Sequence, residues 1–258
     1  KHDCNGVFLV ELLGREAPGL VRVRNRPETA RRIAVPPWSG PVEQRLVHPL
    51  IQSRHLGPLA LRGWAHALLP VDAGGLLAEE TLAREAPHAQ GYLAGQRPFL
   101  AQRRSRVFAA SPFYRVFGVG PYAWAPCLVV WCGMSLRPDF AVVDRVDDPF
   151  LGPVRPLIDS ACYLIATGSP DEAWFVAGLL HSQAAQQFLR GRSSGSKRGL
   201  GQAVVSRLAL PRFAPENPEH RALSSTAAAL AGQGLASAPL AEALEPASAP
   251  VGDILRPH

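Results

Sequence analysis

The fold is decided by the stretch SPDEAWFVAGLLHSQAAQQFLRG, residues 169–191, together with three short apolar runs that precede it. The stretch predicts a well-capped helix. Ser169 is placed to cap its N-terminus, Pro170 takes the first helical position, and Glu172 can close a capping box. Aromatic and leucine side chains supply apolar contacts along the helix, and Gly191 is placed to end it.

The runs before this helix predict strands: LVVW at residues 128–131, FAVVDR at 140–145 and CYLIA at 162–166. Nearer the start, residues 7–13 and 20–24 alternate and predict a strand pair joined by the turn region 14–19. Residues 42–55 predict a helix, and residues 76–106 predict helix in two pieces around Pro87 and Pro98. The expected fold class is α+β, a mixed sheet with packed helices.

The composition changes near residue 215. Residues 216–258 are dominated by Ala, Ser and Pro; residues 222–231 could form one helix, and the last ten or so residues are expected to be disordered. We therefore expect a domain over residues 1–215 and an Ala/Pro-rich tail, helical or disordered, over residues 216–258.

The overall composition excludes several classes of protein. A hydrophobic fraction of 47% in 258 residues is enough for a buried core and excludes collagen-like and disordered chains. The longest apolar runs are far shorter than the roughly 20 residues that cross a bilayer, so we expect a cytoplasmic protein without a membrane partner. Four cysteines without zinc spacing predict a reducing compartment and no metal. Met134 is the only methionine, so we expect a piece of a longer protein.

The charge is basic and is concentrated before residue 216. There are 27 Lys and Arg against 21 Asp and Glu, and 25 of the basic residues are Arg. Two Arg and five acidic residues lie beyond residue 215, so the first 215 residues carry +9. Guanidinium groups favour phosphate-bearing partners. A GC-rich coding sequence could also explain the preference for Arg over Lys, but it does not explain why the net charge is positive.

Two basic clusters and one aromatic cluster are candidate contacts with nucleic acid. The first cluster lies in a Gly/Ser-rich loop after the predicted helix and contains Arg190, Arg192, Lys197 and Arg198. The second contains Arg103, Arg104 and Arg106 at a helix end, where the helix dipole alone could place them. Tyr114 lies among the aromatics of residues 113–124 and could stack on a base. A solvated loop and ordinary core packing are the alternatives.

The sequence contains no convincing catalytic site. FGVG at residues 117–120 and SPFY at 111–114 look superficially like a glycine-rich cofactor loop and an Asn-Pro-Pro-Tyr loop, but they lack the strand and helix that such motifs require. We assign no catalytic residue. Asp144, Asp147 and Asp148 form an acidic group like those of metal nucleases, without the usual E-x-K partner, and leave a nuclease as a minor alternative.

Several segments together resemble the C-terminal target-recognition region of N6-adenine DNA methyltransferases, the TaqI-like specificity domain found in restriction-modification enzymes. The matching segments are NGVFLVELL (5–13), GLVRVRN (19–25), VEQRLVHPLIQSRHL (42–56), SPFYRVFGVGPYAWAPCLVVWCGMS (111–135), SPDEAWFVAGLLHS (169–182) and LALPRF (208–213). They occur in the family's order and span nearly all of residues 5–213.

The resemblance implies a non-catalytic domain that reads the target sequence while an absent catalytic domain methylates adenine. It implies double-stranded DNA as one partner and the catalytic domain, on the same or a separate polypeptide, as the other. Arg54 lies at the entry to the recognition domain, where the family usually holds a basic residue. No cofactor is expected in this chain, and S-adenosylmethionine would belong to the catalytic domain. The alternative is a structural remnant of a restriction-modification subunit that does not contact DNA.

Overall fold

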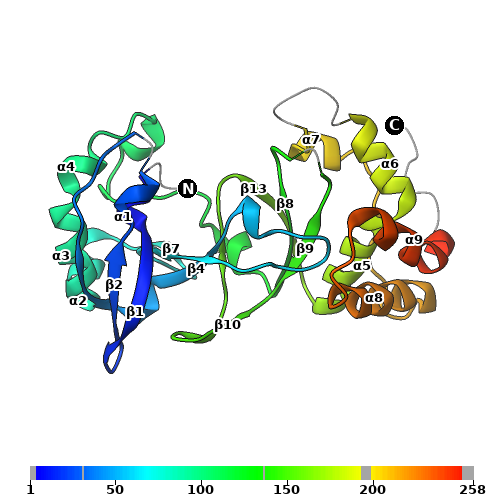
Figure 1. The fold of residues 1–258 in the computed structure, drawn as a ribbon, viewed down its shortest axis with the longest axis horizontal. Coiled ribbons are helices and arrows are strands. Elements are labelled where there is room, and N and C mark those ends of the chain that lie inside the picture. The colour runs from blue at the N-terminus through cyan, green and yellow to red at the C-terminus, as the bar shows by residue number, and fades with distance from the viewer. Residues whose placement is uncertain (1–3, 31, 136, 193–198, 252–258) are drawn as a thin grey trace. The chain divides into compact units, whose positions relative to one another are not determined.

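The computed structural model describes residues 4–30, 32–135, 137–192 and 199–251, and the chain forms two compact units (Figure 1). Unit 1 consists of Lys1–Leu50, Trp64–Trp124 and Arg145–Ser160, and unit 2 consists of Ile51–Gly63, Ala125–Asp144 and Ala161–His258. Each unit has a hydrophobic core of its own. Helices and sheets occur in both units, so the predicted α+β class is confirmed. Among the described residues, no helix has both the length and the apolar character needed to cross a membrane.

Unit 1 is built on a six-stranded sheet with the order β12-β4-β5-β1-β2-β3. The predicted hairpin near the N-terminus is confirmed, because β1 and β2 pair antiparallel with Leu12 opposite Val23. Gly19 makes the connecting turn at a φ of 75°, a backbone conformation that glycine adopts without steric cost. The strands are β1 (Leu9–Ala17), β2 (Leu20–Asn25), β3 (Ser39–Glu43), β4 (Val47–Ile51), β5 (Ala65–Leu68) and β12 (Leu157–Ile158).

The helix predicted over residues 42–55 is wrong. This segment forms the end of β3, the short 3-10 turn η2 (Gln44–Leu46), β4 and a second 3-10 turn, η3 (Ser53–His55). Pro49 would have to sit inside the helix, where it lacks a hydrogen-bond donor and clashes with the preceding turn. All five residues of β4 are buried, and they pair with β5. Pairing with distant strands therefore outweighs the local helical pattern.

The helices of unit 1 follow the predicted breaks at Pro87 and Pro98. Residues 76–106 contain α2 (Glu79–Glu85), α3 (Pro87–Gly95) and α4 (Arg97–Leu100), and both prolines lie in the first turn of a helix. Tyr92 of α3 is buried and donates its hydroxyl hydrogen to the carbonyl of Val7 (2.7 Å). The remaining elements are α1 (Asn5–Phe8), the ribbon β6 (Val71–Asp72) and β7 (Gly75–Leu76), the ribbon β10 (Val146–Asp148) and β11 (Gly152–Val154), and the 3-10 turns η1 (Pro27–Thr29), η4 (Arg106–Phe108) and η5 (Pro121–Trp124).

Unit 2 contains an antiparallel three-stranded sheet with the order β13-β8-β9, made from the three predicted runs. The strands are β8 (Cys127–Cys132), β9 (Phe140–Val143) and β13 (Cys162–Thr167). Trp131 of the central strand is buried against Phe140 of β9, and its indole nitrogen donates to the carbonyl of Leu200 (2.7 Å). This hydrogen bond satisfies the one polar atom of the largest buried side chain in the unit.

The helix that follows this sheet is capped as predicted but is shorter than expected. The Ser169 hydroxyl accepts from the amide of Glu172 (3.2 Å), and the Glu172 carboxylate accepts from the amide of Gly168 (2.7 Å). The helix divides at Ser182 into α5 (Pro170–His181) and α6 (Gln183–Arg192). Gly191 lies in the last turn of α6, so the helix ends one residue after the predicted position.

The Ala-rich segment belongs to the core of unit 2. It forms α8 (Pro218–Ala231), which contains the helix expected at residues 222–231, and α9 (Ser237–Ser248), and both lie against α5 (Figure 1). Leu223, Ala227, Leu240 and Leu244 are buried in the same cluster as Phe175 of α5. The predicted boundary at residue 215 therefore does not coincide with a division in the structure. The short elements α7 (Gln202–Val205) and η6 (Ala249–Val251) complete the unit.

Candidate nucleic-acid interface

Residues 53–63 of unit 2 form a loop with two exposed arginines, Arg54 and Arg62, which we call the arginine loop. Leu59 fastens this loop to β9. Its amide donates to the carbonyl of Phe140 (2.8 Å), and its carbonyl accepts from the amide of Val142 (3.1 Å). The Leu59 side chain is fully buried in the unit 2 core. Hydrogen bonds and burial together fix the backbone that carries the two arginines.

His55 joins the two ends of the arginine loop. Its carbonyl accepts from the amide of Arg62 (2.8 Å), and Nε of Arg54 lies 3.1 Å from its Nε2. The amide of Gln52 lies 3.1 Å from the other ring nitrogen, Nδ1. A neutral imidazole has one unprotonated nitrogen, so only one of these two ring contacts is a full hydrogen bond. Arg54 was predicted from the sequence, whereas Arg62 was missed because its position depends on how the loop closes.

Helix α6 carries the first predicted basic cluster. Gln186 is buried, its amide donates to two backbone carbonyls of unit 2, and its oxygen accepts from Arg190 (3.3 Å). The guanidinium of Arg192 lies 5.3 Å from the centre of the Phe188 ring. Both arginines are exposed in the last turn of α6, where positive charge is favoured by the helix dipole. Lys197 and Arg198, predicted in the same cluster, lie outside the described residues.

The second predicted cluster is divided between surface and interior. Arg104 and Arg106 are exposed in the segment that follows α4. Arg103 is buried, donates to the carbonyls of Arg115 (2.6 Å) and Phe113, and lies with its guanidinium 4.3 Å from the centre of the Phe108 ring. Its donors therefore hold residues 113–115 in place. Its predicted contact with DNA does not fit this position.

Tyr114 is also an interior residue. Its side chain is fully buried, and its hydroxyl donates to the carbonyl of Leu77 (3.0 Å). Burial raises the pKa of Tyr114 to about 12. The Tyr114 ring lies edge-on to Phe113, as in ordinary core packing. Stacking of Tyr114 on a base does not fit this position.

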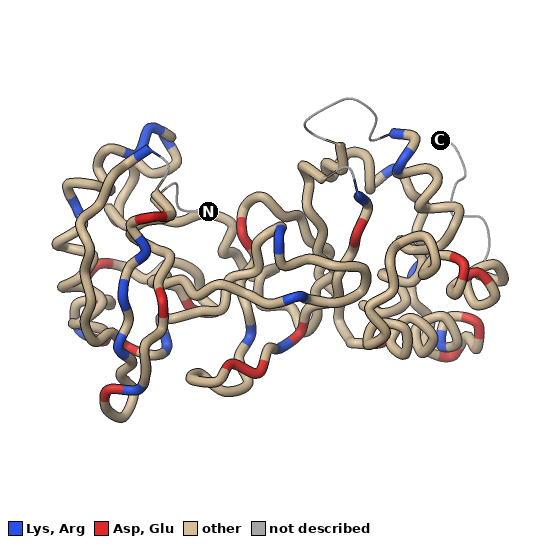
Figure 2. Tube along the Cα trace, in the orientation of Figure 1, with Lys and Arg blue, Asp and Glu red and all other residues tan. Residues whose placement is uncertain are grey.

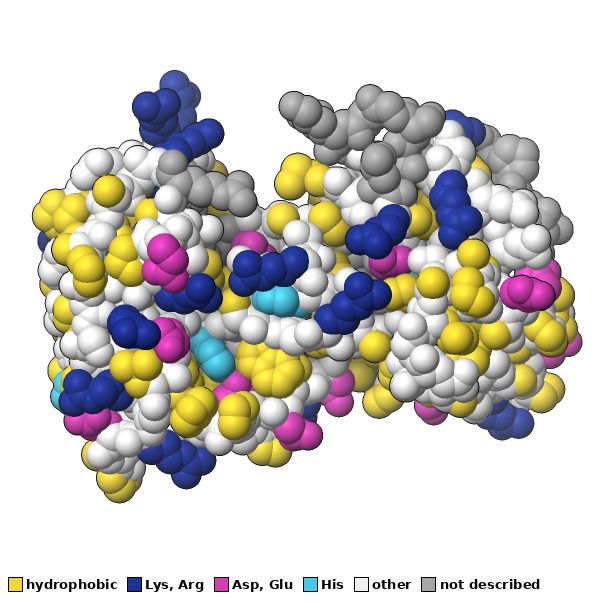
Figure 3. Space-filling model, in the orientation of Figure 1, with side chains coloured by type: hydrophobic (Ala, Val, Ile, Leu, Met, Phe, Trp, Pro, Cys, Tyr) yellow, Lys and Arg dark blue, Asp and Glu magenta, His cyan; other side chains and the backbone are white. Residues whose placement is uncertain are grey.

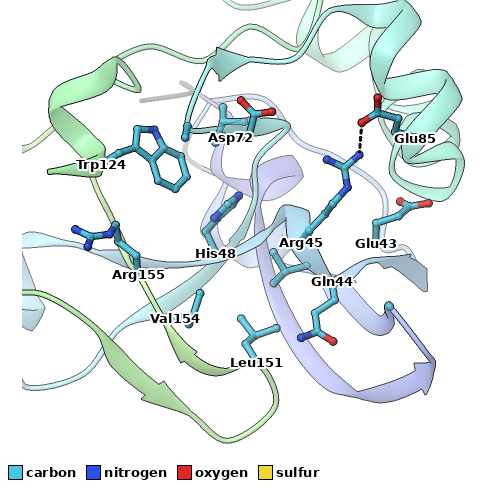
Figure 4. A pocket seen from close by; sticks show the side chains of 14 residues that line it. Glu43, Gln44, Arg45, His48, Asp72, Glu85, Trp124, Leu151, Val154 and Arg155 are labelled. Carbon is cyan, nitrogen blue, oxygen red and sulfur yellow. Dashed lines mark hydrogen bonds and ion pairs between the residues drawn. The ribbon is translucent and has the colours of Figure 1, made fainter. Parts of the chain in front are cut away.

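Unit 1 contains a pocket of about 730 Å³ that the sequence did not predict. Figure 4 shows the rings of His48, from β4, and Trp124, from η5, pointing into it. Burial lowers the pKa of His48 to about 4, so this ring is neutral at pH 7. No described atom forms a hydrogen bond with Nε2 of His48 or with Nε1 of Trp124, and both atoms are buried. The sequence did not indicate this pocket, because residues 42–55, which include His48, were predicted to form a helix.

The acidic residues proposed for a nuclease do not form a common site in the described part of the chain. Asp148 is buried and accepts hydrogen bonds from Trp64 (2.8 Å) and from the amides of Phe150 and Leu151 (3.0 Å each), while Nε2 of His66 lies 2.6 Å away. These contacts hold the pKa of Asp148 below its usual range against the effect of burial. No group of three or more His, Cys, Asp or Glu among the described residues could hold a metal ion.

Positive charge is distributed over both units. By sequence, unit 1 contains 16 basic and 12 acidic residues, and unit 2 contains 11 and 9. On the β1–β2 hairpin, basic and acidic residues are interspersed (Figure 2) and form ion pairs, Arg22 with Glu16 (2.7 Å) and Arg24 with Glu11 (2.6 Å). Figure 3 shows basic side chains on the visible face of each unit. The arrangement within each unit is therefore several small basic areas on a mixed surface.

Comparison with known proteins relates the chain distantly to a methyltransferase. No protein-family model matches the chain. The chain is similar to the Type II methyltransferase M.NspV of Nostoc sp. (strain ATCC 29411 / PCC 7524), with 23% identity over 150 residues. The match covers 57% of this chain and 30% of the Nostoc protein, so the chain spans less than a third of that relative. This similarity supports a methyltransferase-related protein.

Proposed function

We propose that the chain is the DNA target-recognition part of an N6-adenine DNA methyltransferase of a restriction-modification system. The observation that carries the proposal is the similarity to a Type II methyltransferase over less than a third of that protein's length. The resemblance of residues 5–213 to a target-recognition region favours the DNA-reading role over the catalytic one. S-adenosylmethionine and the catalytic residues would then belong to a separate catalytic domain, the second partner of the chain.

The contact residues that we propose are the exposed arginines Arg54, Arg62, Arg104, Arg106, Arg190 and Arg192. Arg54, Arg62 and Arg192 form no ion pair with a described acidic residue, so contact with phosphate would not first require a protein ion pair to break. Phosphate contacts would position the chain on the duplex, and base contacts would supply the specificity. Because the arginine loop is fixed to β9, its backbone at Arg54 and Arg62 would lose little conformational freedom on binding.

Binding of the whole chain to a labelled DNA duplex, measured by fluorescence anisotropy, tests this proposal. We expect log K to fall with log salt with a slope of about 0.9 per phosphate neutralised. The double variant Arg54→Ala/Arg62→Ala should weaken binding about tenfold at ~50 mM salt and reduce the slope by about one to two. Arg190→Ala/Arg192→Ala should act in the same way.

The matched control is Arg22→Ala/Arg24→Ala, which removes the same charge from arginines that are paired with glutamates on the hairpin. If this control weakens DNA binding less than the two test variants do, the loss in those variants comes from lost contacts and not from the change in net charge. If the folded chain binds no duplex at ~50 mM salt, the proposal fails and the structural remnant of a restriction-modification subunit is the better description. DNA cleavage in the presence of magnesium or manganese would instead favour the nuclease.

A further inference from the structure

We propose that the pocket in unit 1 binds a nucleobase, with a purine as the best fit. The pocket is built mainly from four parts of unit 1: the η2–β4 segment, β6 with the residue after it, the end of η5, and residues 151–155 in and beside β11. Its volume of about 730 Å³ lies within the range of sites for small organic ligands. Val47, Val71, Leu151 and Val154 give it apolar walls, as a flat aromatic ligand requires.

Two buried polar atoms of the pocket call for a ligand that forms hydrogen bonds. Nε1 of Trp124 and Nε2 of His48 are buried without a hydrogen-bond partner among the described atoms. A buried polar atom without a partner costs free energy, and a ligand recovers it when the side chains of the pocket turn to bring that atom to the ligand. The indole N–H can only donate, so the ligand must offer an acceptor. The ring nitrogens of a purine are acceptors of this kind, and its amino group can serve as a donor.

The aromatic side chains of the pocket favour a flat ligand. The Trp124 and His48 rings lie edge to face, with centres 6.3 Å apart, and both point into the pocket (Figure 4). His48 is only 6% exposed, and its ring is carried by β4, which lies between β12 and β5 in the sheet. A base could stack on the indole while its edge meets His48. Stacking on an indole is available to every base and is more extensive for a purine than for a pyrimidine.

The charges of the pocket favour an uncharged ring over a free phosphate. Two arginines line it, Arg45 and Arg155, together with three acidic residues, Glu43, Asp72 and Glu85. Arg45 already forms an ion pair with Glu85 (3.2 Å), and Glu43 accepts from the amides of His88 and Ala89 (3.0 and 2.9 Å). The walls thus offer no excess of positive charge, so a phosphate would gain little there, whereas a neutral base fits.

The base could come from a free nucleoside or from a nucleotide extruded from bound DNA. Binding of a free nucleoside does not depend on the proposed DNA-recognition function. The extruded nucleotide does rest on that function, because it requires the duplex to be bound. Both sources present the same ring to Trp124 and His48.

Calorimetric titration of the whole chain with adenosine, up to ~1 mM, tests the proposal. We expect saturable binding at one site per chain. Trp124→Leu removes both the stacking surface and the hydrogen-bond donor. It should weaken adenosine binding ~10- to 100-fold. His48→Leu should weaken it about tenfold. Adenosine monophosphate should bind no more tightly than adenosine, because the pocket offers no excess positive charge.

The matched control is Trp64→Phe, which removes an indole from unit 1 whose nitrogen is bonded to Asp148 and which does not line the pocket. This variant should bind adenosine as the unaltered chain does. Circular dichroism and thermal unfolding verify that every variant is folded. If the folded chain does not bind adenosine, or if Trp124→Leu and His48→Leu bind it unchanged, the proposal is overturned, while the anisotropy measurements still decide DNA binding separately.

A duplex that contains one 2-aminopurine distinguishes the two sources of the base. An increase in 2-aminopurine fluorescence that Trp124→Leu abolishes indicates extrusion into this pocket. Adenosine binding without such an increase assigns the pocket to a free nucleoside or a related small molecule.

Discussion

Leu59 shows how one residue can hold the arginine loop in a conformation that its own backbone disfavours. Its φ of 62° lies in the left-handed region, where a side chain beyond glycine costs about 1 to 2 kcal/mol. Such a conformation persists when surrounding contacts over-determine it. Here the two hydrogen bonds to β9 and the burial of the Leu59 side chain supply those contacts.

Substitutions at Leu59 should separate the backbone strain from the burial. Leu59→Ala should destabilise unit 2 by about 2 to 4 kcal/mol, because buried methyl groups are lost while the strained φ remains. Leu59→Gly loses the same packing but relieves the strain, so it should be at least as stable as Leu59→Ala, the reverse of the usual order. Urea unfolding of both variants measures the difference. A glycine variant clearly less stable than the alanine variant would contradict the strained φ.

His181 makes the stability of unit 2 depend on pH. The ring is fully buried, and Nε2 lies 2.9 Å from the carbonyl of Phe140. Burial lowers the pKa of His181 to about 4 against the opposing effects of the Phe140 backbone and of Asp139. An unfolded histidine has a pKa near 6.5. The unfolded chain therefore binds a proton between about pH 6.5 and pH 4 that the folded chain does not bind. Stability is present above that window and is lost as the pH falls through it.

Removing the buried imidazole should flatten this dependence. Between pH 7 and pH 4.5 the unfolding free energy of the unaltered chain should lose up to about 3 kcal/mol through His181. His181→Gln should lose correspondingly less over the same range, although its stability at pH 7 is lower. Urea unfolding at several pH values provides the comparison. If the free energy of unfolding depends on pH equally in the two proteins, then protonation of His181 does not differ between the folded and the unfolded state, and the prediction fails.

At the scale of elements, the contact between α5 and α8 explains a glycine in the middle of a helix. Gly178 lies on α5 where it meets α8, and a Cβ atom added there would lie 3.0 Å from Cδ1 of Leu223 and 3.3 Å from Cβ of Ala227. Gly191, on α6, has no such neighbour within 4 Å. The two glycines lie in the same unit and differ in what surrounds them.

The two glycines should therefore respond in opposite ways to the same substitution. Glycine inside a helix is about 1 kcal/mol less favourable than alanine, so Gly191→Ala should stabilise unit 2 slightly. Gly178→Ala gains the same propensity but forces α5 and α8 apart, and we expect a net loss of about 1 to 3 kcal/mol. Thermal unfolding followed by circular dichroism measures both. Stabilisation by Gly178→Ala would mean that the two helices pack less closely than the structure shows.

At the scale of the whole molecule, the Ala-rich segment is part of a folding unit. Leu223, Leu240 and Leu244 are at most 1% exposed and belong to the core that also contains Phe175. Residues 1–215 alone would leave the apolar face of α5 uncovered. Each residue assigned to unit 1 precedes Ala161, so this unit keeps all its elements in such a fragment.

Truncation after residue 215 should therefore unfold unit 2 and spare unit 1. We expect loss of more helical circular dichroism than α8 and α9 contribute, binding of a hydrophobic dye, and protease cleavage confined to unit 2. Leu223→Asp in the whole chain should act in the same direction, because it buries a charge in the same contact. Ala222→Asp, on the exposed side of α8, is the matched control and should remain stable. A cooperatively folded unit 2 in the fragment would contradict this account.

Local signals were sufficient for elements whose form depends on their own residues. Ser169, Pro170 and Glu172 predicted the start of α5, and Pro87 and Pro98 predicted the breaks between the unit 1 helices, because caps and prolines act within one turn. The apolar runs predicted β8, β9 and β13 for a similar reason. Residues 42–55 were assigned wrongly, since the partners that make them strands, in β2 and β5, lie elsewhere in the sequence.

The candidate sites divide in the same way between what local sequence signals indicate and what only long-range contacts decide. By itself the sequence determined the α+β class and the basic charge of residues 1–215, because class and charge follow from composition and periodicity, and it offered Arg54, Arg190 and Arg192 as candidates. Only the tertiary structure decided that Arg103 and Tyr114 are buried, that Arg62 joins Arg54 on one fixed loop, and that His48 and Trp124 meet in a pocket. Burial and proximity depend on contacts between residues far apart in the chain, and no local pattern encodes those contacts.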